Sequence, residues 1–142
     1  MRLFAAAAIM LAAAAVAVPG ATAKDFHPGD LRVCGADSCL AITNRAILPL
    51  VGSFYYSGPQ PRVVPQARIG APAFELRFRN GYATGIVAST SLDRFLSYGV
   101  YIERFQRGKW YAVPPRFAQE LRRLSASLKP LRVTPATVAK SR

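Results

Sequence analysis

The sequence predicts an α+β domain, an antiparallel β-meander of four to six strands with two helices packed on one face. One indication is strict alternation of apolar and polar residues over 74–79, followed by Asn80-Gly81, a strong two-residue turn signal. The other is a run of apolar residues at helical spacing after Pro114-Pro115: Phe117, Leu121, Leu124 and Leu128. Hairpins followed by a helix of this kind are typical of helices covering one face of an antiparallel sheet.

The N-terminus reads as a cleavable secretory signal peptide covering residues 1–23. Arg2 precedes an unbroken apolar run from Leu3 to Val18, shorter than the roughly 20 residues of a spanning helix. Pro19-Gly20 breaks the run, and small residues follow up to a cleavage point between Ala23 and Lys24. An uncleaved N-terminal anchor is the alternative.

Cleavage would leave a single small basic domain, residues 24–142, with no stable membrane span. We expect it to be secreted or extracytoplasmic, in the periplasm or cell wall. It carries 18 Lys and Arg against seven Asp and Glu, a formal charge of +11. Such a charge favours anionic envelope polymers or lipid headgroups as partners, whereas a specific nucleic-acid partner is not expected. In the whole sequence arginine outnumbers lysine 15 to 4, so compositional bias is an alternative source of the charge.

Cys34 and Cys39 are expected to form a disulfide, since an oxidising compartment favours one. They flank the polar stretch 35–38 between two apolar stretches, which predicts a hairpin near the new N-terminus. A redox dithiol is the weaker alternative, because the spacing is not C-x-x-C.

The alternating segment and its return strand, 82–89, predict a register in which Phe78 faces Ala83 and Phe74 faces Val87. One face of this hairpin is then expected in the core and consists of Phe74, Leu76, Phe78, Ala83, Gly85 and Val87. The opposite face consists of Glu75, Arg77, Arg79, Tyr82, Thr84 and Ile86.

A second hairpin is expected to pair residues 100–105 with 110–113 around Arg107-Gly108, with Phe105 facing Trp110. Residues 93–97 fit either a strand or a helical turn. Residues 43–54 fit a short or kinked helix capped by Thr43-Asn44. The Pro-rich stretch 57–72 fits an extended segment that crosses the domain.

The helix that begins at Pro114-Pro115 is expected to end at Pro130, with Glu120 on its solvent-exposed face. For the tail, residues 130–142, two alternatives remain: a short helix capped at Thr134-Pro135, or disorder.

No catalytic, metal or cofactor motif stands out, so a non-catalytic domain is expected. His27, the single histidine, reads as a solvated terminal residue rather than part of a catalytic or metal site. Glu75 and Glu103 could pair as glycosidase carboxylates, but Glu75 more simply pairs with Arg77. An unrecognised hydrolase therefore stays only as an alternative.

One candidate binding surface remains, an Arg/Tyr face of the sheet that could grip phosphate, carboxylate or sugar. Its candidate residues are Arg77, Arg79, Tyr82, Arg104, Arg107, Lys109 and Tyr111. Binding of anionic material through this face is the leading functional expectation. A protein-interaction or inhibitor-like module, with an envelope protein as its partner, is the alternative function. A face that is only solvent-exposed, or that the Pro-rich segment covers, would carry neither function.

Overall fold

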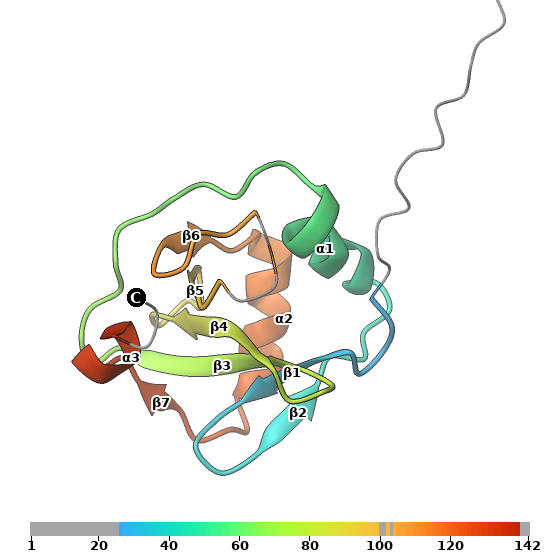
Figure 1. Cartoon of the computed structure of the whole chain (residues 1–142). Coiled ribbons are helices and arrows are strands. Elements are labelled where there is room, and N and C mark those ends of the chain that lie inside the picture. The colour runs from blue at the N-terminus through green and yellow to red at the C-terminus, as the bar shows by residue number, and fades with distance from the viewer. Residues whose placement is uncertain (1–25, 100–101, 103, 140–142) are drawn as a thin grey trace, which may run out of the picture.

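The computed structural model describes residues 26–99, 102 and 104–139 (Figure 1). Its strands are β1 (Leu31–Cys34), β2 (Cys39–Ala41), β3 (Pro72–Phe78), β4 (Ala83–Ala88), β5 (Arg94–Ser97), β6 (Trp110–Ala112) and β7 (Leu131–Arg132). Its helices are α1 (Leu48–Gly52), the π-helical turn η1 (Ser53–Ser57), α2 (Pro115–Ser125) and α3 (Pro135–Ala139). The α+β class is confirmed. No helix within these described ranges is both long and apolar enough to cross a membrane.

The strands form one antiparallel sheet in the order β2-β1-β3-β4-β5-β6, and β7 pairs with β3. The described residues thus give seven strands rather than four to six. The addition is β7, a two-residue strand in the tail for which disorder was the alternative. The tail then continues into α3, where the Thr134 hydroxyl accepts a hydrogen bond from the Thr137 N–H at 3.1 Å, as a capping residue does.

The N-terminal hairpin is confirmed. Cys34 lies opposite Cys39 at a Cα–Cα distance of 4.0 Å, and the two form the disulfide. The Gly35 N–H donates to the Ser38 carbonyl at 2.9 Å and closes the loop between β1 and β2. The predicted signal segment, residues 1–23, and its cleavage point between Ala23 and Lys24 lie outside the described residues.

The β3–β4 hairpin has the predicted register from Ala73 to Leu76, with Phe74 opposite Val87. Near the turn the prediction that Phe78 faces Ala83 is wrong, because Arg77 pairs with Ala83 instead. The connection is a three-residue loop ending at Gly81, whose φ is +88°, and the Phe78 N–H donates to the Tyr82 carbonyl at 2.8 Å. A glycine with positive φ closes loops of this kind.

The register shift changes the side-chain direction of Thr84, which the sequence predicted on the outer face. Thr84 is buried, its hydroxyl lies 3.0 Å from the Tyr55 hydroxyl, and it also donates to the Leu76 carbonyl at 3.3 Å. A bulge re-aims a side chain in this way.

The second predicted hairpin is wrong in its partner strand. Strand β6 pairs with β5, and Phe95 lies opposite Tyr111. Phe105 and Trp110 do not face each other but belong to separate apolar clusters. The Arg107-Gly108 turn does precede β6, but it folds back on the end of β5, where the Gly108 N–H donates to the Ser97 carbonyl at 2.9 Å. Residues 100, 101 and 103 of the proposed partner lie outside the described part.

Both faces of the sheet are covered. The first carries the larger core under α1, η1 and α2, in which the Phe54 ring lies 5.1–5.7 Å from the rings of Phe95, Phe105 and Phe117. Two main helical elements on one face agree with the prediction. The second face carries a smaller core that contains Ile86, Leu96 and Trp110.

The smaller core lies under residues 58–71, which we call the arm, and under the tail from β7 onward. The arm passes from η1 along β6 and returns to the start of β3 (Figure 1). Ala67 of the arm and Val133 of the tail are buried against this face. Ile86, predicted to face outward, is accordingly 2% exposed.

Two expectations about helices also fail. Helix α1 has Ile47 at its N-cap position, so Thr43-Asn44 does not cap it; the Asn44 side-chain oxygen instead accepts from the Ala46 N–H at 3.1 Å. In α2, Glu120 is only 5% exposed rather than on the wet side. Asn44 reaches across to it, which places a polar partner where the sequence suggested water.

Candidate functional site

The seven residues of the predicted Arg/Tyr face do not form one surface. Arg77 forms an ion pair with Glu75, as the simpler interpretation expected. Arg79 turns toward the lead-in to β1, where it donates to the Pro28 carbonyl at 3.0 Å and lies 3.7 Å from Asp30. Tyr82 is half exposed in the β3–β4 loop.

The members near the second turn are divided between core and surface. Tyr111 is 2% exposed, and its hydroxyl accepts a hydrogen bond from the Gln106 N–H at 2.8 Å. The Arg104 guanidinium donates to three carbonyls of η1 and the arm, those of Ser53, Gly58 and Pro59. Arg107 and Lys109 are exposed in the turn before β6. Tyr111 and Arg104 are thus engaged in holding the fold.

A different cationic site lies where the arm meets the β4–β5 turn. The cleft there has a volume of about 510 Å³ and is lined by Gln66, Ala67, Arg68, Ile69, Gly70, Ala71, Pro72, Ser89, Thr90 and Arg94. Two arginines and two hydroxyl residues line it, and no carboxylate does. We call it the arm cleft.

The arm wall of the cleft is fixed at both ends by backbone hydrogen bonds. At one end the Val64 N–H donates to the Trp110 carbonyl at 3.0 Å, so that the arm borders the edge of β6. At the other end the Gly70 N–H donates to the Val133 carbonyl at 2.7 Å. Pro61 and Pro65 bracket the segment that borders β6, which limits further strand pairing there.

The facing wall is the β4–β5 turn, whose backbone is strained. Ser89 has φ +90° and Leu92 φ +52°, values that residues other than glycine seldom adopt. Ser89 is held there by its N–H, which donates to the Pro72 carbonyl at 3.2 Å, and by its hydroxyl, which donates to Asp93 at 2.6 Å. The strain is therefore compensated by specific hydrogen bonds.

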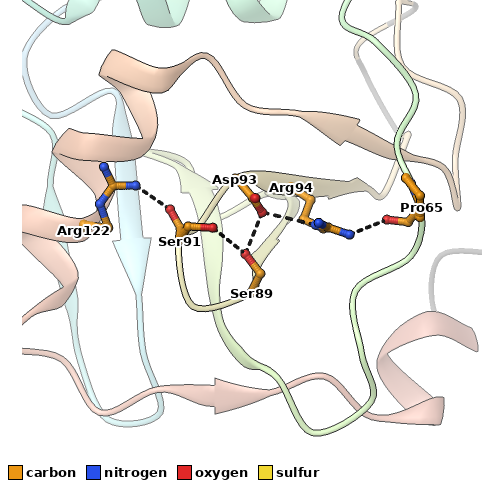
Figure 2. Close-up of polar contacts among 6 residues, drawn as sticks. All are labelled: Pro65, Ser89, Ser91, Asp93, Arg94 and Arg122. Atoms are coloured by element: carbon orange, nitrogen blue, oxygen red, sulfur yellow. Dashed lines mark hydrogen bonds and ion pairs between the residues drawn. The ribbon is translucent and has the colours of Figure 1, made fainter.

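Polar contacts run in a continuous chain from α2 through this turn to the arm (Figure 2). Arg122 of α2 donates to the Ser91 carbonyl at 2.6 Å, and the Ser91 and Ser89 hydroxyls lie 3.4 Å apart. Beyond Ser89 and Asp93, Arg94 donates from Nε to the Asp93 carboxylate at 3.2 Å and from Nη1 to the Pro65 carbonyl at 3.2 Å. The chain fixes the Arg94 guanidinium between the turn and the arm.

Asp93 is held ionised by this arrangement. Burial, the largest single effect, raises its pKa, but hydrogen bonds from Ser89, Ser91 and Arg94 and the charge of Arg94 together outweigh burial and keep the pKa below its ordinary value. Asp93 is therefore a carboxylate that orients Arg94, and it does not take up a proton near neutral pH.

Arg68 differs from Arg94 in that none of the described residues pairs with its guanidinium. It is exposed on the arm and lines the cleft, and its side chain makes no hydrogen bond or ion pair with any residue that the structure describes. The side chains of Gln66 and Thr90 likewise have no hydrogen-bond partner among those residues. At the rim, Arg132 donates to the Gly70 carbonyl at 3.3 Å. The lining of the arm cleft therefore combines two arginines with hydroxyl and amide groups and contains no carboxylate.

Such a site can bind an anion, and among the described residues no histidine lines it. The Ser89 hydroxyl donates a hydrogen bond directly to Asp93, with no histidine between them. His27 is exposed and lies 3.4 Å from Asp30. No metal-binding group of three or more His, Cys, Asp or Glu occurs across the part of the chain that the structure describes. Glu103, one of the two proposed hydrolase carboxylates, falls outside that part.

Sequence reasoning missed the residues of the arm cleft. It treated the Pro-rich stretch 57–72 as a connection and left residues 93–97 open, so Arg68 and Arg94 were not brought together. The available signal was an arginine in the middle of the Pro-rich stretch, combined with the Ser- and Thr-rich turn ahead of Asp93-Arg94. No family model, no curated protein and no solved structure matches this chain.

Proposed function

We propose that this protein is an exported, non-catalytic domain that binds anionic material of the cell envelope or its surroundings, and that the arm cleft is its binding site. The cleft lining supports this proposal, because Arg68, whose side chain has no partner among the described residues, lines the cleft and no carboxylate does. A guanidinium presents a fork of donors suited to carboxylate, phosphate and sulfate oxygens.

The charge balance of the surroundings supports the same proposal. The described residues include fifteen Lys and Arg and five Asp and Glu, and each of these five carboxylates lies in an ion pair with a basic side chain. A net charge of +10 remains on them, which attracts anions from a distance and is screened by salt. The Cys34–Cys39 disulfide is compatible with an extracellular location.

Retention on a dextran sulfate matrix tests the site. Arg68→Gln removes the unpartnered cleft charge, whereas Arg45→Gln removes one charge from an exposed arginine outside the cleft. We expect Arg68→Gln to elute at clearly lower sodium chloride concentration than Arg45→Gln, because oriented contacts add to the uniform attraction of net charge.

Equal elution of the two variants would show that net charge alone retains the protein and would contradict the cleft proposal. A loss of retention in the double variant Arg77→Ala, Arg79→Ala, with Arg68→Gln unaffected, would return the site to the sheet face inferred from the sequence. Circular dichroism on each variant confirms that the fold is intact before the comparison is made.

A further inference from the structure

The arm cleft presents side-chain donors from three separate segments. Arg68 lies on the arm, Thr90 on the β4–β5 turn and Arg94 at the start of β5. A planar carboxylate is satisfied by a single guanidinium fork, whereas the oxygens of a tetrahedral anion diverge and accept from donors on several sides. The distribution of donors thus favours a phosphate group over a carboxylate.

The local charge agrees with a doubly charged group. Three guanidinium groups lie at the cleft or its rim, those of Arg68, Arg94 and Arg132, and one of them is offset by Asp93. The net charge of +2 on these four side chains complements a phosphate monoester, which carries close to two negative charges at neutral pH.

The size and remaining lining of the cleft indicate that the phosphate is carried on a larger body. A volume of about 510 Å³ lies in the range of small-molecule sites and leaves room beyond a single phosphate group. The rest of the lining combines apolar walls at Ala67, Ile69 and Pro72 with the unpartnered amide of Gln66. A sugar ring has both an apolar face and hydroxyl groups, so it suits such a lining.

We infer that the arm cleft takes a sugar phosphate monoester, with the phosphate between Arg68, Arg94 and Thr90 and the sugar ring along the arm. This inference rests on the proposed function, since it names the chemical class bound at the same site. It differs from that proposal in requiring selection for phosphate over carboxylate and for a sugar over a bare anion.

Isothermal titration calorimetry of the purified protein with three probes tests the inference: glucose 6-phosphate, glucuronate and inorganic phosphate. We expect glucose 6-phosphate to bind at least about tenfold more tightly than either of the others. Arg68→Gln should weaken glucose 6-phosphate binding by about tenfold or more, whereas Arg45→Gln should change it less than about twofold, since only the first touches the cleft.

The outcomes separate this inference from the proposed function. Equal affinity for glucose 6-phosphate and glucuronate, both weakened by Arg68→Gln, would overturn phosphate selection and leave anion binding in the cleft intact. If inorganic phosphate binds as tightly as glucose 6-phosphate, the inferred contact between the cleft and a sugar ring is wrong. If no probe binds, or if the two variants behave alike with each probe, the inference is wrong; the dextran sulfate experiment then decides the proposed function independently.

Discussion

At the scale of single residues, Glu120 shows how a charged side chain can be accommodated inside a small domain. It is 5% exposed, yet its carboxylate accepts from Arg123 at 2.7 and 3.0 Å and from the Asn44 amide at 3.3 Å. The Arg123 hydrogen bond, more than the opposing effect of burial, keeps the pKa of Glu120 below its ordinary value. The buried charge links α2 to the segment between β2 and α1.

We predict that Glu120→Gln lowers the free energy of unfolding by about 2 kcal/mol at pH 7, because hydrogen bonds to a charged group are lost at a buried position. Urea denaturation measures it. Asp37→Asn is the matched control: the carboxylate of Asp37 is 70% exposed and lies 3.9 Å from Lys129, so its removal should cost less than about 0.5 kcal/mol. Similar losses in the two variants would contradict the assignment.

The same carboxylate sets a pH dependence. Because the folded-state pKa of Glu120 is lowered, its contribution to stability is full above the unfolded-state value near 4.5 and is lost as pH falls through the folded-state value. The stability difference between the wild-type protein and Glu120→Gln should therefore shrink below about pH 4.5. A constant difference down to pH 3 would be inconsistent with a titrating Glu120.

At the scale of elements, several features with a local sequence pattern were predicted correctly. The β1–β2 hairpin, the long part of the β3–β4 register and the start of α2 at Pro115 all follow from neighbouring residues. Strand β5 could not be assigned, because it is buried on both faces: Phe95 packs in the larger core and Leu96 in the smaller one. Two adjacent apolar residues between Arg94 and Ser97 show no alternation that would mark a strand.

The disulfide hairpin gives an element-scale prediction. Cys34 and Cys39 are five residues apart, and a loop this short restricts the unfolded chain only modestly. The double variant Cys34→Ala, Cys39→Ala should therefore lose about 2 kcal/mol of unfolding free energy while keeping the native circular dichroism spectrum. Loss of the folded spectrum at 25 °C would show that the hairpin depends on the cross-link far more than its loop length implies.

At the scale of the whole molecule, the candidate site joins segments that the sequence keeps apart. Arg68 and Arg94 are separated by all of β3 and β4, and they line the same cleft because the arm folds back over the second face of the sheet (Figure 1). The sequence did raise the possibility that the Pro-rich stretch covers that face. It could not show that covering the face would also create a cleft, because a cleft depends on where two surfaces fail to fill the space between them.

The excess of positive charge connects stability to the proposed binding. A net charge of +10 on the described residues destabilises the folded state through self-repulsion, so sodium chloride should raise the unfolding free energy by screening. At matched ionic strength sodium sulfate should raise it further, partly through the general exclusion of sulfate from protein surfaces. A bound anion adds a separate contribution, about 1.4 kcal/mol at ten times its dissociation constant.

Arg68→Gln separates the two contributions of sulfate. Exclusion from the surface acts on every variant alike, whereas binding between Arg68, Arg94 and Thr90 needs the cleft guanidinium. We therefore predict that the extra stabilisation by sulfate over chloride, measured by urea denaturation, is smaller in Arg68→Gln than in Arg45→Gln. An identical sulfate response in these two variants, which have equal net charge, would mean that the arm cleft holds no tetrahedral anion at these concentrations.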